Sequence, residues 1–259
     1  MNILEKICKI KQKEIQSLKK YKSIESFLSL ERVIKKNGFF SCLMKDKINL
    51  IAEIKKKSPS AGLIKRNFDI IKIAKAYKNA GAECLSILTE NKFFGGKIEF
   101  IDKVKKKVDI PVLRKDFIID EWQIYESFYY GADCILLIAA ILDDKQIVKY
   151  TKIAKSLKLD VILEVHNEIE TKRAIDLGAD CIGINNRNLK TLQVNIDNFE
   201  ILSKNIPKNV IKIAESGLTK NEQLLKLKKK GANAFLVGEF LIKQENILKS
   251  TQELIQYNE

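Results

Sequence analysis

Four stretches of the sequence share one pattern and decide the fold: NAGAECLSIL (79–88), YGADCILLIA (130–139), LGADCIGINN (177–186) and KGANAFLVGE (230–239). In each stretch a helical pattern ends at a glycine suited to the left-handed cap conformation, and an apolar run of strand length follows a short polar turn. The intervals between these glycines are about twice as long as one strand and one helix require. Each interval therefore has room for a second strand.

An apolar run of strand length does fall in each interval, and one more precedes the first stretch. These runs are NLIAEIK (49–55), IPVLRK (110–115), DVILEV (160–165) and NVIKIAE (209–215). Together with the four stretches they predict eight strands separated by helices. The helical patterns cover residues 69–80, 98–107, 120–130, 143–157, 168–177, 197–204, 219–230 and 240–256.

Strands that alternate with helices at this spacing predict right-handed crossovers and a parallel sheet. Eight such units favour an α/β fold, a single parallel (β/α)8 TIM barrel, although an open doubly wound sheet also satisfies the pattern. Residues 1–45 predict an N-terminal helical extension that either caps the lower end of the barrel or covers its mouth. Because no linker rich in Gly, Ser or Pro interrupts the chain, we expect one domain over 1–259, with the barrel at 46–259.

The composition bears on which partners the chain could have. The formal net charge is +14, which would suit a nucleic-acid-binding protein, but only five of the 47 basic residues are arginines and the lysines are scattered through nearly every segment. Arginine is the preferred residue for bidentate contacts to phosphates and bases. We therefore expect solvated helix faces and no nucleic-acid partner, and a basic nucleic-acid-binding protein is the alternative from another functional class.

Cysteine, histidine and hydropathy indicate the compartment and the available ligands. The five cysteines are widely spaced and mostly embedded in apolar runs, which argues against a disulfide framework. One histidine and no paired cysteines leave almost no ligands for zinc, so no metal site is expected. With no long uncharged apolar run and a charged N-terminus, we expect a cytoplasmic protein without membrane contact.

Charged and amide side chains end several otherwise apolar runs at one edge of the predicted barrel. In a parallel barrel the carboxyl ends of all the strands meet at this edge, where catalytic groups lie. Carboxylates and ammonium groups around one mouth can tune each other's protonation and exchange protons with a substrate. The sequence therefore predicts a proton-transfer site built from Glu53, Lys55, Lys115, Glu164, Asn185, Arg187 and Glu215.

Two turns offer backbone amides to an anion. Ser216-Gly217 follows the seventh predicted strand and Gly238-Glu239 follows the eighth, and in barrels of this kind these turns can bind phosphate. No GxxxxGK[ST] or GxGxxG sequence occurs, which argues against a P-loop and against dinucleotide binding. His166 is interpreted as a loop residue or a supporting residue behind the site, and Trp122 with its aromatic neighbours as packing residues.

A family resemblance begins directly after the first strand. Residues 53–62 read EIKKKSPSAG and resemble the signature ExKxxSPSxG of indole-3-glycerol phosphate synthases, at the place where that family has it. The resemblance extends over the barrel and the N-terminal extension. Further segments that resemble the family follow in order: LTENKFFGG (88–96), LRKDFIID (113–120), LLI (136–138), LEV (163–165), GINNRNLKTL (183–192), AESG (214–217) and LVGE (236–239).

The resemblance implies a reaction without a cofactor. Members of the family convert 1-(2-carboxyphenylamino)-1-deoxyribulose 5-phosphate into indole-3-glycerol phosphate, releasing carbon dioxide and water in tryptophan biosynthesis. By motif, Lys115 resembles the general acid, Glu164 the acid/base partner for dehydration, and Lys55 a group that binds substrate anion and assists proton delivery. The resemblance gives roles in orienting substrate and holding the lysines charged to Glu53, Asn185 and Glu215.

The resemblance also implies which residues surround the two ends of a phosphorylated small-molecule substrate. Arg187 resembles a substrate-side arginine, and Glu239 is expected to offer only its backbone amide to phosphate, since some relatives carry serine there. The expected substrate contacts are Ser58, Phe94, Phe117, Leu136, Leu189 and Leu236. The expected phosphate contacts are Lys55, Ser216, Gly217, Gly238 and Glu239.

Related enzymes are the nearest alternatives. The isomerase that makes this substrate and the α subunit of tryptophan synthase are also phosphate-binding barrels, but they lack the ExKxxSPS signature. We expect a monomer or a weak homodimer.

Overall fold

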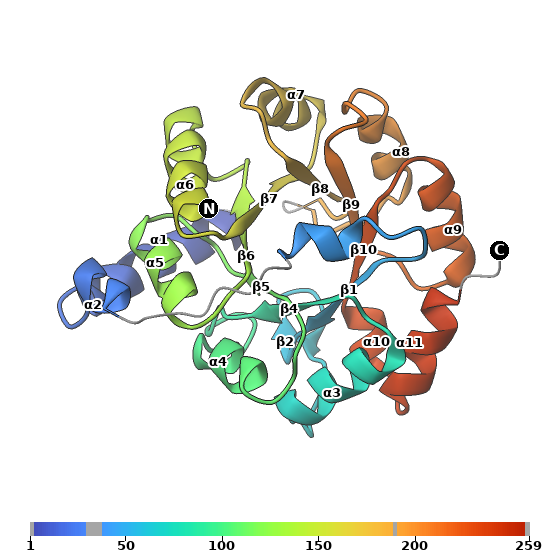
Figure 1. The fold of residues 1–259 in the computed structure, drawn as a ribbon, viewed down its shortest axis with the longest axis horizontal. Coiled ribbons are helices and arrows are strands. Elements are labelled where there is room, and N and C mark those ends of the chain that lie inside the picture. Colours follow the sequence, from blue (N-terminus) through green and yellow to red (C-terminus); the bar gives the residue numbers. More distant parts are fainter. Residues whose placement is uncertain (1–2, 30–37, 189–190, 257–259) are drawn as a thin grey trace.

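Eight parallel strands close into a barrel in the computed structural model, which describes residues 3–29, 38–188 and 191–256 (Figure 1). The first strand closes the barrel, because Ile51 lies opposite Leu236 of the last strand on one side and opposite Cys84 of the next strand on the other. The predicted barrel is confirmed, and the open sheet is excluded. The strands are β1 (Leu50–Ile54), β4 (Cys84–Leu88), β5 (Val112–Lys115), β6 (Cys134–Ile138), β7 (Asp160–Val165), β8 (Cys181–Asn185), β9 (Ile211–Glu215) and β10 (Ala234–Val237).

Helices form a ring around these strands (Figure 1). Their starts and stops follow local sequence: the side chain of Asp69 caps the first helix of the ring, which ends at Gly81 with a φ of 100°. In the described ranges no helix combines the length and apolarity needed to cross a bilayer. The helices are α3 (Ile70–Ala80), α4 (Glu99–Lys105), α5 (Trp122–Tyr129), α6 (Asp144–Ser156), α7 (Glu168–Asp176), α8 (Asp197–Ser203), α9 (Asn221–Lys229), α10 (Glu239–Lys243) and α11 (Ile247–Ile255).

Two local expectations were wrong or incomplete. The single helix predicted over 240–256 is two helices, because Gln244 takes an extended ψ of 145° and the side chain of Asn246 accepts from Lys249 N at 3.0 Å to start α11. The signature segment after β1 contains a small antiparallel hairpin, β2 (Lys57–Ser58) and β3 (Gly62–Leu63), which periodicity did not predict. Strands of two residues are too short to show a periodic pattern.

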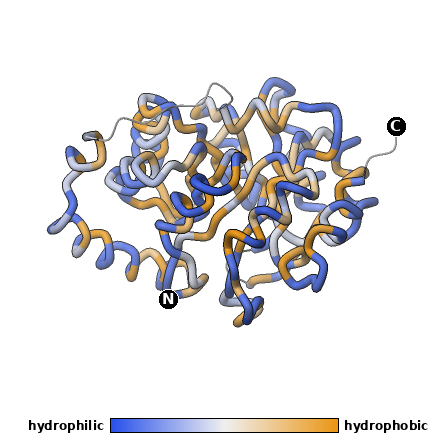
Figure 2. Tube along the Cα trace, turned by 60° about the horizontal axis from the view of Figure 1, so that its bottom comes forward, coloured by the Kyte–Doolittle hydropathy of each residue, from blue (hydrophilic) through white to orange (hydrophobic). Residues whose placement is uncertain are grey.

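The apolar core has two layers. One layer fills the inside of the barrel and the other lies between the strands and the ring of helices. Figure 2 shows hydrophobic segments concentrated in the centre, while the surrounding helices alternate between hydrophobic and hydrophilic residues. This alternation is the pattern of helices that bury one face. The inner layer includes Ile51, Cys84, Leu113, Cys134, Leu136, Ile162, Cys181, Ile213, Ala234 and Leu236.

The N-terminal extension contributes to both ends of the barrel. The 3-10 helix η1 (Phe40–Leu43) lies at the amino ends of the strands, where Phe40 N donates to Asp160 Oδ2 at 3.0 Å. Phe39 and Leu43 are fully buried there against the inner layer of the core. The helix α1 (Ile3–Leu18) lies at the opposite end, where its residues line a cavity described below. Both placements that the sequence left open are therefore realised by different parts of the extension.

The helix that follows α1 packs on the outside of the barrel beside α5 (Figure 1). Phe27 of the short helix α2 (Ile24–Leu28) meets the ring of Trp122 edge-on at 5.1 Å between centroids. The indole Nε1 of Trp122 donates to Lys22 O at 2.8 Å. Trp122 is therefore a packing residue, as the helical spacing of the aromatic residues indicated.

Replacing Phe39 by Ala should empty the amino end of the barrel without touching the opposite end. Since a fully buried phenylalanine is truncated, we expect the free energy of unfolding to fall by about 3–5 kcal/mol. Urea unfolding of the variant measures the loss, and Met44→Ala, on a side chain that is 60% exposed, is the matched control. A Phe39→Ala protein as stable as the control would show that η1 does not close the barrel.

Candidate active site

A cavity of about 420 Å³ opens at the carboxyl ends of the barrel strands. Its wall combines residues from every part of the predicted site, although they are far apart in the chain. Of the site residues predicted from sequence, the structure brings all the described ones together here; Leu189 lies outside the described residues. The predicted residues in the wall are Glu53, Lys55, Ser58, Phe94, Lys115, Phe117, Leu136, Glu164, Asn185, Arg187, Glu215, Ser216, Gly217, Leu236, Gly238 and Glu239.

Lys115 occupies the centre of the polar half of the cavity. Its Nζ donates to Glu164 Oε2 at 2.6 Å and to Glu215 Oε2 at 2.9 Å. All three side chains are at most 14% exposed. Residues at the carboxyl ends of β5, β7 and β9 thus form one buried cluster of an ammonium group between two carboxylates.

The cluster has strongly displaced pKa values. Burial alone would lower the pKa of Lys115, but the carboxylates of Glu164 and Glu215 outweigh it and raise this pKa above its ordinary value. Burial would raise the pKa of Glu164, whereas the neighbouring Lys115 ammonium lowers it well below the usual range. For Glu215, burial and the nearby Glu164 carboxylate exceed the effect of Lys115 and raise the pKa to about 7. Lys115 is therefore cationic and Glu164 anionic at neutral pH.

A glycine on the neighbouring strand β8 makes room for the side chain of Glu215. A Cβ at Gly183 would overlap Glu215 Oε1, so only glycine leaves room for this carboxylate. No hydrogen-bond partner reaches that oxygen among the described residues. A buried carboxylate with one free oxygen and a raised pKa is able to take up or share a proton.

A second ion pair lies across the mouth. Lys55 Nζ contacts Glu53 Oε1 at 2.6 Å, and the two residues point to the same face because they are two apart at the end of β1. Asn185 Oδ1 accepts from the backbone N–H of Arg187 at 2.9 Å, which fixes the turn after β8. The Arg187 guanidinium donates to Leu192 O at 3.0 Å, and both residues line the cavity.

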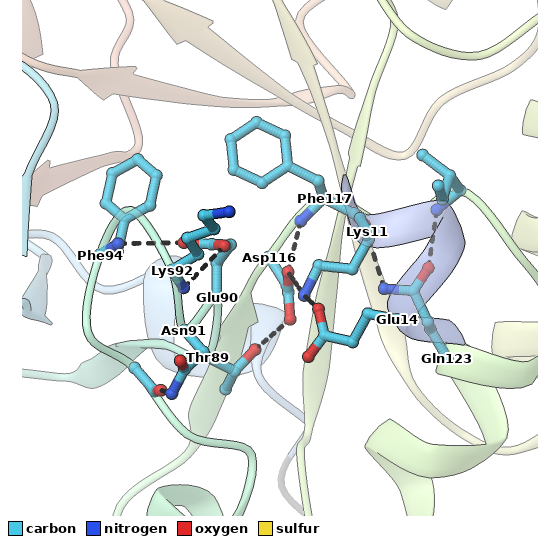
Figure 3. Close-up of polar contacts among 12 residues, drawn as sticks. Lys11, Glu14, Thr89, Glu90, Asn91, Lys92, Phe94, Asp116, Phe117 and Gln123 are labelled. Carbon is cyan, nitrogen blue, oxygen red and sulfur yellow. Dashed lines mark hydrogen bonds and ion pairs between the residues drawn. The ribbon is translucent and has the colours of Figure 1, made fainter. Parts of the chain in front are cut away.

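Two phenylalanines form the apolar half of the cavity. The rings of Phe94 and Phe117 lie 6.0 Å apart with a 38° angle between their planes. The first ring is placed by Glu90, which is 2% exposed and accepts from the backbone N–H groups of residues 92, 93 and 94 at 3.0, 2.7 and 3.0 Å. Figure 3 shows this carboxylate beneath the loop that carries Phe94. The Glu90 carboxylate thus takes the place of the backbone carbonyls that would accept these N–H groups in a helix or strand, and it fixes the loop that carries Phe94.

Asp116 holds the second ring and joins it to the N-terminal helix (Figure 3). Its Oδ1 accepts from Phe117 N at 2.8 Å and lies 3.2 Å from Lys11 Nζ of α1. Its Oδ2 accepts from Thr89 at 2.5 Å and from Arg114 at 3.1 Å. With Lys11 only 5% exposed, this ion pair connects α1 to the residue directly after Lys115.

The turns after β9 and β10 form a polar corner of the cavity. Ser216 and Gly217 both have positive φ, at 69° and 80°, and Gly238 lies so close to Glu53 that a Cβ there would overlap the carboxylate. The Glu239 carboxylate turns to Lys243 at 2.7 Å and lies 3.8 Å from Arg187. In the described ranges no three acidic, histidine or cysteine side chains come close enough to hold a metal ion.

Sequence reasoning missed two features of this site. Ile3, Leu4 and Ile7 of α1 line the cavity, and Lys11 reaches Asp116, but no motif marks them. The signal available in the sequence was a lysine on an otherwise apolar helix face, which is ambiguous because long side chains commonly snorkel to solvent.

Known proteins of one family resemble this chain over nearly its whole length. The family model described as indole-3-glycerol phosphate synthase matches residues 4–254. An indole-3-glycerol phosphate synthase of Caldanaerobacter subterraneus subsp. tengcongensis is 46% identical over 94% of this chain and 94% of its own length. One of Legionella pneumophila is 44% identical over 98% of each. The crystal structure of 3-hexulose-6-phosphate synthase from Salmonella typhimurium has a TM-score of 0.66 at 13% identity, covering 80% of this chain and 96% of that one, and shares the fold.

Replacing Lys11 by Met should loosen α1 from the barrel. Because the substitution removes one cation from the buried Asp116, we expect a destabilisation of about 1–3 kcal/mol and faster amide hydrogen exchange in residues 3–18. Lys13→Met, on the exposed face of the same helix, is the matched control. Equal exchange rates in the two variants would show that the ion pair does not hold the helix.

Proposed function

The chain belongs to the indole-3-glycerol phosphate synthase family, the carboxy-lyases that make indole-3-glycerol phosphate in tryptophan biosynthesis, and on that basis we propose that Lys115 and Glu164 carry its chemistry. The proposed substrate is 1-(2-carboxyphenylamino)-1-deoxyribulose 5-phosphate. One observation supports the proposal above the others: a buried, charged Lys115 lies between two carboxylates in a cavity with one polar and one aromatic end.

The two ends of the cavity suit the two ends of this substrate. The carboxyphenyl ring would pack against the wall formed by Phe94 and Phe117, with Leu136 and Leu236 beside it. The phosphate would bind at the turns after β9 and β10, where Gly217 and Gly238 expose backbone amides and Lys55 adds a positive charge. The remaining contacts proposed for substrate or phosphate are Ser58, Arg187, Leu189, Ser216 and Glu239.

Ring closure requires a proton on the ketone oxygen. Lys115 would donate it while the aromatic carbon that bears the carboxylate attacks the ketone carbon, which forms the new carbon–carbon bond. The carboxylate then leaves as carbon dioxide, and its electron pair restores the aromatic ring. Burial of the charge between two carboxylates keeps Lys115 protonated before the step, as a general acid requires.

Dehydration requires both an acid and a base at the same end of the substrate. The hydroxyl formed at the former ketone would take a second proton, delivered by Lys55, and leave as water, while Glu164 would accept the proton that the neighbouring methylene carbon loses as the indole double bond forms. Glu164 is suited to this because it is anionic and lies 2.6 Å from the acid. Glu53, Asn185 and Glu215 would orient the substrate hydroxyls and the lysines.

We also propose that the protein acts in the cytoplasm as one domain over residues 1–259, as a monomer or weak homodimer. The described residues support the single domain, because α1 and η1 both attach to one barrel. Sedimentation velocity at micromolar concentration would separate these forms from a higher oligomer.

Replacing Lys115 by Met should remove the acid and leave the cavity walls in place. We expect kcat to fall about 10²–10⁴-fold while substrate binding is still measurable. Indole fluorescence after adding the anthranilate-linked ribulose phosphate follows turnover, and Lys103→Met, on an exposed position of α4, is the control. Turnover of Lys115→Met within tenfold of the wild type would refute the assigned role, and no fluorescent product from the wild type would refute the activity.

A further inference from the structure

His166 lies directly behind the candidate acid/base residue. It follows β7 by one position, its side chain is 10% exposed, and its Nε2 is 3.2 Å from Glu164 Oε1. The two atoms are within ion-pair distance but are not aligned as a hydrogen bond, since no hydrogen-bond partner is found for Nε2 in the described residues. It is also the only histidine of the chain.

The two oxygens of Glu164 face different cationic groups. Oε2 accepts from Lys115 at 2.6 Å, while Oε1 faces the imidazole of His166. Glu164 is 2% exposed, so water cannot replace either partner without rearrangement. Rotation of this carboxylate would break one contact or the other, and the pair of cations therefore defines its orientation.

The imidazole is itself fixed from the far side. Glu170 of α7 lies 3.0 Å from His166 Nδ1, and the same carboxylate oxygen accepts from His166 N at 2.8 Å. Its other oxygen accepts from Asn167 Nδ2 at 2.7 Å. This arrangement leaves the ring little freedom and directs Nε2 toward Glu164.

Electrostatics favour a charged ring. Burial would lower the pKa of His166, but Glu164 and Glu170 outweigh it and raise this pKa to about 9. The groups that face the ring are Glu164 from β7 and Glu170 from α7, while α8 contributes the uncharged amide of Asn198, 3.4 Å from the His166 carbonyl. Lys115 of β5 stands on the other side of Glu164.

We propose that His166 is a positioning residue, an imidazolium held by Glu170 that keeps the Glu164 carboxylate ionised and aimed at the reacting end of the cavity. The inference rests on the proposed role of Glu164, which it deepens. Lys115 alone could neutralise Glu164, but once Lys115 has donated its proton, a Glu164 without His166 would have no cation in contact with it. His166 supplies that second charge, so Glu164 remains a carboxylate until dehydration.

The charge of the ring can be measured without any turnover. In an untagged protein with isotopically labelled histidine, nuclear magnetic resonance reports one imidazole, because the chain has one histidine. We expect an imidazolium at pH 7, and a fall of its pKa in Glu170→Gln and in Glu164→Gln. Glu168→Gln, on an exposed position of the same helix, should leave the titration unchanged. A neutral ring at pH 7 in the wild type would overturn the proposal.

Kinetics test the consequence for Glu164. In His166→Gln we expect kcat to fall about tenfold with KM changed less than about twofold, and the acid limb of kcat to move to higher pH by roughly one unit or more, because Glu164 loses a positive neighbour. Glu170→Gln, which keeps the imidazole but removes its anchor, should move the limb in the same direction. An unchanged kcat–pH profile in both variants contradicts the proposal even if the enzyme is active, whereas an inactive wild type contradicts the proposed function alone.

Stability should depend on pH in a matching way. A histidine with a raised pKa in the folded state contributes stability in full below its unfolded value, about 6.5, and loses it as the pH rises through about 9. The difference in unfolding midpoint between the wild type and His166→Gln should therefore shrink from pH 6 to pH 10. A difference that is constant over this range would show that the ring is not charged in the folded protein.

Discussion

The buried ammonium group of Lys115 is the interaction on which the rest of the site depends. A charge taken out of water is costly unless opposite charges meet it at close range, and here Glu164 and Glu215 do so at 2.6 and 2.9 Å. The three residues lie at the carboxyl ends of β5, β7 and β9, which are not neighbouring strands, so only the closed barrel brings them together. Closure of the barrel therefore also keeps Lys115 protonated, because it brings the two carboxylates next to the ammonium group.

The same principle, a buried carboxylate that fixes its surroundings, recurs around the cavity. Glu90 holds the loop of Phe94, and Asp116 holds Phe117 while it pairs with Lys11 of α1. Glu170 fixes His166 behind Glu164. Loops at the mouth of a barrel have few backbone partners, and ionised side chains supply the missing acceptors. Ionised side chains thus hold both the aromatic end and the acid/base end of the cavity, and two of them, Glu90 and Glu170, lie outside its wall.

The barrel could be predicted from sequence because its signals are local and repeated. Glycine caps, apolar runs and charged strand ends recur along the chain, and the rim residues Glu53, Lys115, Glu164 and Glu215 followed from the geometry of parallel strands. Contacts between distant segments have no such signal. The break between α10 and α11, the reach of Lys11 to Asp116 and the pairing of His166 with Glu164 each depend on tertiary packing.

The most direct test of the central claim is a crystal structure with indole-3-glycerol phosphate bound. The account predicts the indole ring against the wall formed by Phe94 and Phe117, the phosphate at the amides of Gly217 and Gly238, and Lys115 Nζ within hydrogen-bonding or van der Waals distance of the newly formed ring. Product bound elsewhere, or Lys115 turned away from it and still bound only to Glu164 and Glu215, would contradict the account.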